Sequence, residues 1–189
     1  MQAVILAAGK GTRMRPLTSK LPKPLLQIGG QRILEHTIEQ LHGIVDEVIL
    51  VVGYRGKLIQ KSFRDNYKGI KITYAWQKEQ SGTGDAAKQA LPFLKGPCLF
   101  INGDDLYDKR DIKKILGKYP SILVATTEHP ERYAVIETKG NRVISLLEKP
   151  KHPTGNLVSV GMYFLDPLIF QWNIKKSSRG EYEFTDYIR

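Results

Sequence analysis

The sequence contains a single cysteine, Cys98, and no apolar run long enough to span a membrane. One cysteine excludes a disulfide within the chain and fits a reducing compartment. The N-terminus also lacks the basic-then-apolar layout of a signal peptide, so we expect a cytoplasmic protein with no membrane partner. Cys98 lies in an apolar stretch and is expected in the core. The histidines are too scattered for zinc-ligand spacing: His36, His42, His129 and His152.

A concentrated basic arm is also missing, although the chain has 29 Lys and Arg against 19 Asp and Glu, a net charge of +10. An excess of positive charge favours either nucleic acid or smaller polyanions as partners. The positive residues are scattered and have no aromatic residues interleaved among them, which disfavours nucleic acid. We therefore expect phosphorylated small molecules as partners. The oligomeric state is left open.

At 189 residues the chain is long enough for one domain, and its hydrophobic pattern predicts an α/β fold. β-branched and apolar runs predict strands at residues 3–8, 46–52, 70–76, 97–101, 121–127 and 157–165, and a period near 3.6 predicts helices at 32–42, 57–67, 85–94 and 108–119. This alternation is typical of a Rossmann-like, three-layer α/β/α domain with a mostly parallel mixed sheet. Residues 134–138 and 142–148, on either side of Lys139-Gly140-Asn141, predict an antiparallel hairpin insert.

The most informative segment begins where the first strand ends: LAAGKGTRMRPLT, residues 6–18. Gly9 and Gly11 let the backbone turn sharply and approach a ligand closely. Turns of this kind aim successive N–H groups at one point, which suits an anion. Arg13 and Lys23 add positive charge nearby. We therefore expect a phosphate site at the carboxyl end of the first strand of an open α/β sheet.

Neither common phosphate-binding motif fits this segment. A P-loop needs Gly-Lys-Ser/Thr at the start of a helix, and Pro16 prevents a helix from starting here. A dinucleotide fingerprint needs a third glycine and a later acidic residue, which are both missing. Together with the SKLPKPLL that follows, the segment closely resembles the signature of the sugar nucleotidyltransferases, in particular glucose-1-phosphate thymidylyltransferase and uridylyltransferase catalytic domains. The resemblance implies that a nucleoside triphosphate binds at Leu6, Ala7, Ala8, Gly9, Gly11 and Thr12.

A second stretch, QKEQSGTGDA at residues 77–86, leaves the third strand and enters a helix. A side-chain amide offers a donor and an acceptor to a pyrimidine, and Gly82 would let a base lie against the backbone. The resemblance extends to Gln77, Gly82 and Thr83, with Ser81 in place of the usual leucine. We therefore assign these three matching residues to nucleotide binding and expect uracil or thymine rather than guanine. The alternative is that Gln77 is an exposed polar residue at a strand end.

The fourth strand ends in Ile-Asn-Gly-Asp-Asp, residues 101–105. Because the carboxyl ends of parallel strands share one edge of a sheet, Asp104 should stand beside the glycine loop. Mg²⁺ is typically held by one or two carboxylates together with phosphate oxygens, and the resemblance also places the metal on Asp104. We therefore expect Mg²⁺ as the cofactor. For Asp105, a turn or cap role and a metal contact are both left open.

The tripeptide Glu148-Lys149-Pro150 closes the hairpin. In extended chain fixed by the proline, the first two side chains should point to opposite sides. The resemblance assigns Glu148 to sugar hydroxyls and Lys149 to the sugar phosphate, and it places Ala134 and Ser159 in the same site. Ala134 stands where the family usually has glycine, and Ser159 where uridylyl-transferring members often have asparagine. The sequence therefore leaves the sugar unassigned.

These matches predict an enzyme that joins UTP or dTTP to a sugar 1-phosphate and releases pyrophosphate, with Arg13, Lys23 and Asp104 as its catalytic residues. The attacking phosphate is already ionised, so no general base is needed, and catalysis rests on positioning and charge. Two alternatives remain. One is a non-catalytic regulatory homologue that binds nucleotide sugars, and the other is an enzyme like the molybdenum-cofactor guanylyltransferases.

Residues 1–189 are predicted to form a single nucleotidyltransferase domain that is truncated at its C-terminal end relative to the family. Family domains continue past the element resembling EYEFTDY, residues 181–187, and then supply a second metal-binding Asp or Asn. The sequence offers no such residue at the corresponding place. We therefore expect Asp104 to be the main protein ligand of the metal.

Overall fold

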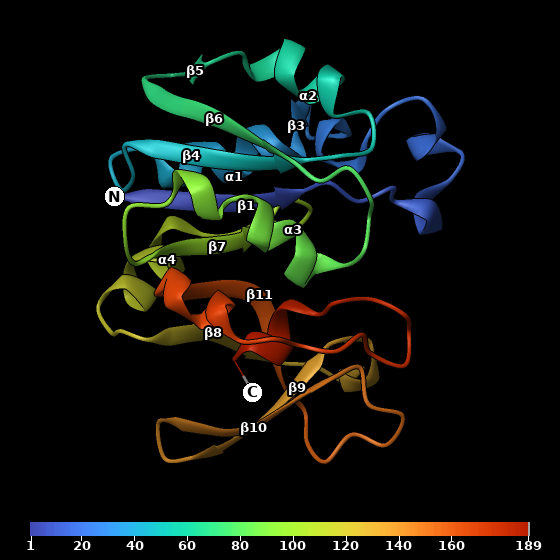
Figure 1. The fold of residues 1–189 in the computed structure, drawn as a ribbon, viewed down its shortest axis with the longest axis vertical. Coiled ribbons are helices and arrows are strands. Elements are labelled where there is room, and N and C mark those ends of the chain that lie inside the picture. The colour runs from blue at the N-terminus through green and yellow to red at the C-terminus, as the bar shows by residue number, and fades with distance from the viewer. Residues whose placement is uncertain (189) are drawn as a thin grey trace.

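The structure, a computed structural model, describes residues 1–188 and is built around one mixed sheet. Its strands are β1 (Gln2–Ala7), β4 (Glu47–Val52), β5 (Asn66–Tyr67), β6 (Ile70–Trp76), β7 (Cys98–Asn102), β8 (Ser121–Thr126), β9 (Ala134–Lys139), β10 (Arg142–Glu148) and β11 (Leu157–Leu165). They follow the order β10-β9-β11-β7-β1-β4-β6-β5, with β8 paired to β11 (Figure 1). A separate small hairpin pairs β2 (Gln27–Ile28) with β3 (Gln31–Arg32).

Helices cover both faces of this sheet. The α-helices are α1 (Ile33–Leu41), α2 (Gly56–Phe63), α3 (Thr83–Gln89) and α4 (Lys109–Leu116). Short 3-10 turns are η1 (Thr12–Met14), η2 (Leu17–Ser19), η3 (Lys23–Leu25), η4 (Leu91–Phe93), η5 (Pro130–Arg132), η6 (Pro167–Gln171) and η7 (Phe184–Tyr187). Within β1, Ile5 packs with residues of α1, α2 and α4, whereas Val4 packs with residues of α3, η6 and η7. This arrangement confirms the predicted three-layer α/β/α architecture.

The four central strands β7, β1, β4 and β6 are parallel to one another. Strands β1 and β4 are buried on both faces, which explains why they are continuous apolar runs rather than alternating ones. The hairpin of β9 and β10 is antiparallel, as predicted, and Gly140 supplies a positive φ of 60° at its turn. Cys98 is fully buried in the core.

The antiparallel part of the sheet extends beyond that hairpin. The alternating pattern suggested that residues 121–127 continue the parallel core, but β8 runs antiparallel to β11, and β11 runs antiparallel to β7. Three predicted helices were also too long, and the one predicted at residues 108–119 ends at Leu116. The chain leaves α2 after Phe63 and forms β5, and the helix from Thr83 ends at Gln89, just before the 3-10 turn that contains Pro92.

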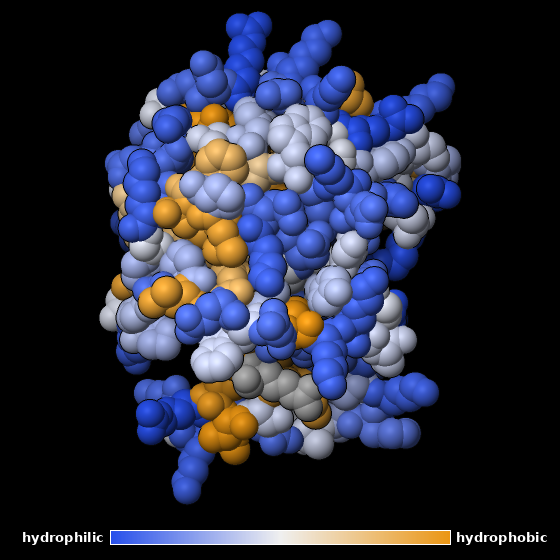
Figure 2. Space-filling model, viewed as in Figure 1, coloured by the Kyte–Doolittle hydropathy of each residue, from blue (hydrophilic) through white to orange (hydrophobic). Residues whose placement is uncertain are grey.

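Hydrophilic residues cover most of the molecular face in Figure 2, and smaller apolar patches interrupt them. In the part of the chain that the structure describes, no helix combines the length and the apolar character needed to cross a bilayer. The parallel arrangement of β7, β1 and β4 has the main consequence for function, since it brings the loops after these strands to one edge of the sheet.

Candidate active site

The loop after β1 and the turn after β7 lie side by side. In the parallel register, Leu6 is paired with Asn102, and the Gly103 N–H donates to the Leu6 carbonyl at 2.9 Å. A Cβ added to Gly103 would lie 2.8 Å from that same carbonyl oxygen, so only glycine allows this approach. The next residue, Asp104, is thereby placed beside the glycine loop, as predicted.

The glycine loop is held on one side and open on the other. Gly11 adopts a φ of 61°, and its carbonyl accepts hydrogen bonds from the Thr18 hydroxyl at 2.7 Å and the Met14 N–H at 3.0 Å. A Cβ added to Gly9 would meet no atom within 4 Å. Within residues 1–188, the backbone N–H groups of residues 9–12 donate to no acceptor. These unused donors are what an anion-binding loop requires.

Two neighbouring cavities meet at this edge of the sheet. The first, which we call the loop cavity, has a volume of about 470 Å³. Its lining includes every residue assigned to the nucleotide: Leu6, Ala7, Ala8, Gly9, Gly11, Thr12, Gln77, Gly82 and Thr83. The second, the hairpin cavity, has a volume of about 920 Å³ and is lined by Ala134, Glu148, Lys149 and Ser159 among others. Both volumes suit small-molecule ligands.

The predicted catalytic residues form the wall that the two cavities share. Arg13, Lys23 and Asp104 line both of them, as does Lys149. The Lys23 Nζ lies 2.6 Å from Asp104 Oδ2 in a partly exposed ion pair. Arg13 makes no hydrogen bond or ion pair within residues 1–188. The wall therefore presents cations toward both cavities and a carboxylate between them.

Asp105 lines the hairpin cavity, as Asp104 does, and its carboxylate accepts hydrogen bonds from neighbouring side chains. The Asn102 Nδ2 donates to Asp105 Oδ2 at 3.3 Å, and the Thr37 hydroxyl donates to the Asp105 carbonyl at 3.2 Å. Burial, followed by the nearby charge of Asp104, raises the pKa of the Asp105 carboxyl above its usual value. These contacts give Asp105 a structural role, and its place in the cavity lining leaves a metal contact open as well.

Glu148 and Lys149 lie on the same side of the chain, contrary to the expectation of opposite sides. Lys149 adopts a φ of 43°, which ends the extended conformation, and its Nζ lies 3.6 Å from Glu148 Oε1. The Thr185 hydroxyl donates to Glu148 Oε2 at 3.3 Å. Both side chains therefore point into the hairpin cavity from the end of β10.

Ala134 and Ser159 occupy buried positions in the hairpin cavity. The Ser159 hydroxyl is engaged with the Tyr163 hydroxyl at 2.8 Å and accepts the Gly161 N–H at 3.2 Å. Gly161 has a φ of 73°, and a Cβ there would lie 2.0 Å from the Asn102 side-chain nitrogen. Ser159 thus supports the bulge in β11 in addition to lining the cavity.

Gln77 is buried rather than exposed, which excludes the alternative of a solvated residue at a strand end. Its Nε2 donates to Asp85 Oδ2 at 2.7 Å and to the Gly82 carbonyl at 3.0 Å. We expected the Gln77 amide to offer both a donor and an acceptor to the base. The donor half of this expectation was wrong. Both N–H groups are already used within the protein.

Gly82 has a reason to be glycine that the sequence did not indicate. Its φ is 114°, and a Cβ would lie 2.4 Å from the Tyr182 carbonyl oxygen. The Tyr182 N–H donates to the Ser81 carbonyl, and the Gly84 N–H donates to the Tyr182 carbonyl, each at 2.8 Å. The loop before α3 therefore pairs with residues 181–183 near the end of the chain, and Gly82 permits that contact.

Arg179 is a site residue that sequence reasoning missed. Its side chain is 37% exposed and lines the hairpin cavity, and it forms ion pairs with Glu183 at 3.0 Å, Glu181 at 3.1 Å and Glu148 at 3.9 Å. The available signal was its position directly before Gly180 and the element EYEFTDY, residues 181–187, which resembles the family. Arg179 adds a fixed cation near Lys149.

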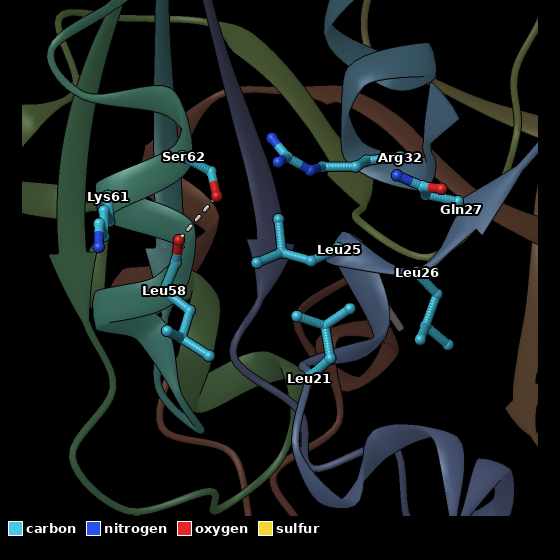
Figure 3. A pocket seen from close by; sticks show the side chains of 8 residues that line it. All are labelled: Leu21, Leu25, Leu26, Gln27, Arg32, Leu58, Lys61 and Ser62. Atoms are coloured by element: carbon cyan, nitrogen blue, oxygen red, sulfur yellow. Dashed lines mark hydrogen bonds between the residues drawn. The ribbon is translucent and has the colours of Figure 1, made fainter. Parts of the chain in front are cut away.

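A further cavity, of about 430 Å³, lies away from these residues between η3 and α2. Figure 3 shows leucines from both elements facing one another across it, with Arg32 and Lys61 at its edge. Its lining contains neither a carboxylate nor any residue assigned to the site. We therefore assign no chemistry to this cavity.

A metal ion has no complete set of protein ligands among the described residues. Within residues 1–188, no three His, Cys, Asp or Glu side chains are grouped so that they could hold a metal. Mg²⁺ commonly takes only one or two carboxylates and completes its octahedron with phosphate oxygens and water. Asp104, at the junction of the two cavities, fits that pattern if a phosphorylated ligand is present.

The fold and the site together define a three-layer α/β protein with an anion-binding loop and a second polar cavity across a wall of charged residues. The chain belongs to the nucleotidyl transferase family, whose model matches residues 2–189. This match confirms the family resemblance that the glycine loop indicated in the sequence.

Three relatives illustrate the range of the family. The Bifunctional protein GlmU of Methanococcus maripaludis is 41% identical over the whole of this chain, which spans 46% of that relative. UTP–glucose-1-phosphate uridylyltransferase AglF of Haloferax volcanii is 36% identical, with 100% of this chain and 82% of AglF covered. A D-glycero-alpha-D-manno-heptose 1-phosphate guanylyltransferase of Campylobacter jejuni is 34% identical, with 90% of this chain and 78% of the relative covered.

The fold also matches solved structures. A crystal structure of UDP-glucose pyrophosphorylase complexed with UDP-glucose superposes with a TM-score of 0.90 at 23% identity, covering 100% of this chain and 85% of the other. A putative glucose-1-phosphate thymidylyltransferase from Bacillus anthracis superposes with a TM-score of 0.82 at 26% identity, covering 99% and 80%. The α/β/α fold with its antiparallel extension is therefore shared with other proteins.

Proposed function

We propose that the chain transfers a nucleotidyl group from UTP or dTTP to a sugar 1-phosphate, giving a nucleotide sugar and pyrophosphate. One observation carries this proposal: Arg13, Lys23 and Asp104 line the wall between the loop cavity and the hairpin cavity. A triphosphate on one side and a sugar phosphate on the other would meet at these charged groups.

The proposed roles follow from position and charge. The free N–H groups of the glycine loop and the Arg13 guanidinium bind the triphosphate, and Lys23 lies toward its α-phosphate. Lys149, supported by Arg179, holds the sugar phosphate, and Glu148 accepts hydrogen bonds from sugar hydroxyls.

In the proposed reaction, a sugar phosphate oxygen attacks the α-phosphorus in line. The bond between the α-phosphorus and the bridging oxygen to the β-phosphate breaks, and pyrophosphate leaves. Positioning and fixed positive charge supply the catalysis, because the attacking phosphate is already ionised. Asp104 would hold Mg²⁺, which neutralises phosphate charge when it is bound.

The relatives support this proposal without fixing the substrate. The name of AglF includes UTP and glucose 1-phosphate, which favours uridylyl transfer to a hexose phosphate. The heptose 1-phosphate guanylyltransferase keeps GTP as a second candidate. We also propose that residues 1–189 form one nucleotidyltransferase domain. The chain spans less than half the length of the GlmU relatives, so their other activities do not transfer to it.

Pyrophosphate release should be measured with each of UTP, dTTP, GTP, CTP and ATP, paired with glucose 1-phosphate, N-acetylglucosamine 1-phosphate and mannose 1-phosphate. Binding of each triphosphate should be measured separately by calorimetry. We expect release with UTP or dTTP. Triphosphate binding without pyrophosphate release from any pair would favour the non-catalytic alternative, and a preference for GTP would favour guanylyl transfer.

A further inference from the structure

The Gln77 side chain is fixed in one orientation. Its Nε2 donates to Asp85 Oδ2 at 2.7 Å and to the Gly82 carbonyl at 3.0 Å. A carboxylate and a carbonyl can only accept hydrogen bonds, so the amide nitrogen must face them. This chemistry settles which end of the amide is oxygen and which is nitrogen, and both hydrogens of the nitrogen are occupied.

The Gln77 oxygen consequently faces the loop cavity. Gln77 is 4% exposed and lines that cavity. Within residues 1–188, Gln77 Oε1 accepts no hydrogen bond. In this part of the chain, every side-chain nitrogen or oxygen that is fully enclosed by protein has a hydrogen-bond partner. The oxygen must therefore be accessible from the cavity. A ligand that reaches it meets an acceptor, because both hydrogens of the Gln77 amide nitrogen are used within the protein.

We propose that Asp85 is a positioning residue that holds the Gln77 oxygen toward the nucleotide base. Uracil, thymine and guanine carry a ring N–H on the edge that pairs with this oxygen, whereas cytosine and adenine carry a ring lone pair there. The site then favours UTP, dTTP or GTP over CTP and ATP. This inference rests on the proposed function, since it assumes that a nucleoside triphosphate occupies the loop cavity.

Asp85 also has a purely structural explanation. It is the third residue of α3, where a carboxylate interacts favourably with the positive end of the helix dipole. The two roles depend on different properties of the side chain. The helix role needs its negative charge, whereas the positioning role needs only an acceptor for the Gln77 N–H.

Two substitutions separate these roles. Asp85→Asn removes the charge but keeps an acceptor oxygen, so the Gln77 amide stays in place. Asp85→Leu removes the acceptor at similar volume and leaves one N–H of Gln77 unoccupied. Rotation of the amide then costs only the remaining hydrogen bond to the Gly82 carbonyl, and it can present an N–H to the cavity, where the ring nitrogen of cytosine can accept it.

The measurement is the affinity of the full 189-residue chain and of each variant for UTP and for CTP, by calorimetry, with thermal unfolding as a check on folding. We expect the wild-type chain to bind UTP at least about tenfold more tightly than CTP, because the wrong base leaves buried groups unpaired. Asp85→Asn should keep this ratio. Asp85→Leu should reduce the ratio of UTP affinity to CTP affinity at least about threefold, because the Gln77 amide can then donate to a base as well as accept from one.

An unchanged UTP-to-CTP ratio in Asp85→Leu would overturn the inference while leaving the proposed function intact. Equal binding of UTP and CTP by the wild-type chain would also overturn it, and this test does not depend on any variant folding. A third comparison uses N3-methyl-UTP, which lacks the ring N–H and should bind the wild-type chain more weakly than UTP. Failure of every triphosphate to bind would instead refute the proposed function itself.

Discussion

Lys23 and Asp104, which are 81 positions apart in the sequence, form an ion pair with 2.6 Å between Nζ and Oδ2. Asp104 follows β7, which pairs with β1, and Lys23 begins η3 and packs beside Gly11 in the loop after β1. Both side chains are partly exposed, and ion pairs of this kind contribute at most about 1 kcal/mol to stability. The position of this pair between the two cavities is therefore best explained by the binding of charged ligands.

Replacing Lys23 with alanine should reduce turnover far more than stability. The change removes a cation aimed at charge that develops on the phosphates, and losing one such group costs about 3–4 kcal/mol, or roughly 10²–10³-fold in rate. The free energy of unfolding should fall by no more than about 1 kcal/mol. Pyrophosphate release and thermal unfolding measure the two effects.

Lys20→Ala is the matched control for this prediction. Lys20 lies in the same loop and carries the same charge, but it lines neither the loop cavity nor the hairpin cavity. Its loss should leave turnover within about twofold of wild type, because a screened surface charge has little effect at a distance. Wild-type turnover in Lys23→Ala would contradict the role assigned to Lys23.

Two glycines near the loop cavity should respond in opposite ways to substitution by alanine. At Gly9, a new Cβ meets no protein atom within 4 Å, so stability should be unchanged while triphosphate binding weakens, because the methyl group occupies the open side of the loop. At Gly82, the Cβ would lie 2.4 Å from a backbone oxygen at a φ of 114°. The free energy of unfolding of Gly82→Ala should therefore be lower than that of the wild-type chain by at least about 2 kcal/mol.

Thermal unfolding and triphosphate binding, measured side by side, decide the comparison. If Gly9→Ala binds UTP as tightly as the wild-type chain, the phosphates do not approach the loop at this residue. If Gly82→Ala unfolds like the wild-type chain, residues 181–183 do not pack against the loop before α3 as described.

The central part of the fold follows from the sequence because its strands are buried on both faces. Apolar runs such as β1 and β4 stand out without any tertiary information. The direction of β8 could not be predicted, because the apolar run of residues 121–127 does not specify which strand it pairs with. Its pairing with β11 depends on contacts between segments more than 30 positions apart.

The site was predictable where a motif carries it. The glycine loop, Asp104 and Lys149 were found from local sequence, and the structure gathers them around two cavities. The orientation of Gln77 was not predictable, because it depends on how Asp85 and the Gly82 carbonyl are arranged in space. Arg179 was missed for a related reason, since its contact with Glu148 forms only after the chain returns to the hairpin.

Mg²⁺ should bind the protein weakly in the absence of nucleotide and more tightly in its presence. Asp104 stands at the junction of the cavities, and no cluster of three ligating side chains exists within residues 1–188 to hold the ion alone. Phosphate oxygens must then complete the coordination. Calorimetric titration with Mg²⁺, with and without UTP, tests this expectation.

Asp104→Asn should abolish the effect of UTP on Mg²⁺ affinity, whereas Asp105→Asn should preserve it. Asp105 lines the hairpin cavity but not the loop cavity, and its carboxylate accepts a hydrogen bond from Asn102, so its loss is expected to alter stability more than metal binding. Tight Mg²⁺ binding to the chain alone would mean that a second ligand is already in place. Loss of the UTP effect in Asp105→Asn would identify that ligand as Asp105.

Glu47 gives a stability prediction that is independent of the site, because it begins β4 at the opposite edge of the sheet. Burial alone would raise the pKa of the Glu47 carboxyl, but hydrogen bonds from Lys71, Thr73, Gln2 and Lys95 outweigh burial and lower the pKa to about 2 from a usual 4.5. The folded state therefore favours the ionised form. Its contribution to stability is complete above about pH 5 and is lost as the pH falls toward 2.

Glu47→Gln should accordingly destabilise the protein by roughly 2 kcal/mol at pH 7, allowing for the exposure of the two lysines. The difference in the free energy of unfolding between Glu47→Gln and the wild-type chain should shrink below about pH 4.5 and nearly vanish near pH 2, because the wild-type carboxyl also loses its charge there. Urea unfolding at several pH values measures it. Asp46→Asn, next to Glu47 but fully exposed, is the control and should have a much smaller effect. Turnover at pH 7 should be the same in both variants, and a loss of turnover in Glu47→Gln would show that this end of β4 is coupled to the site.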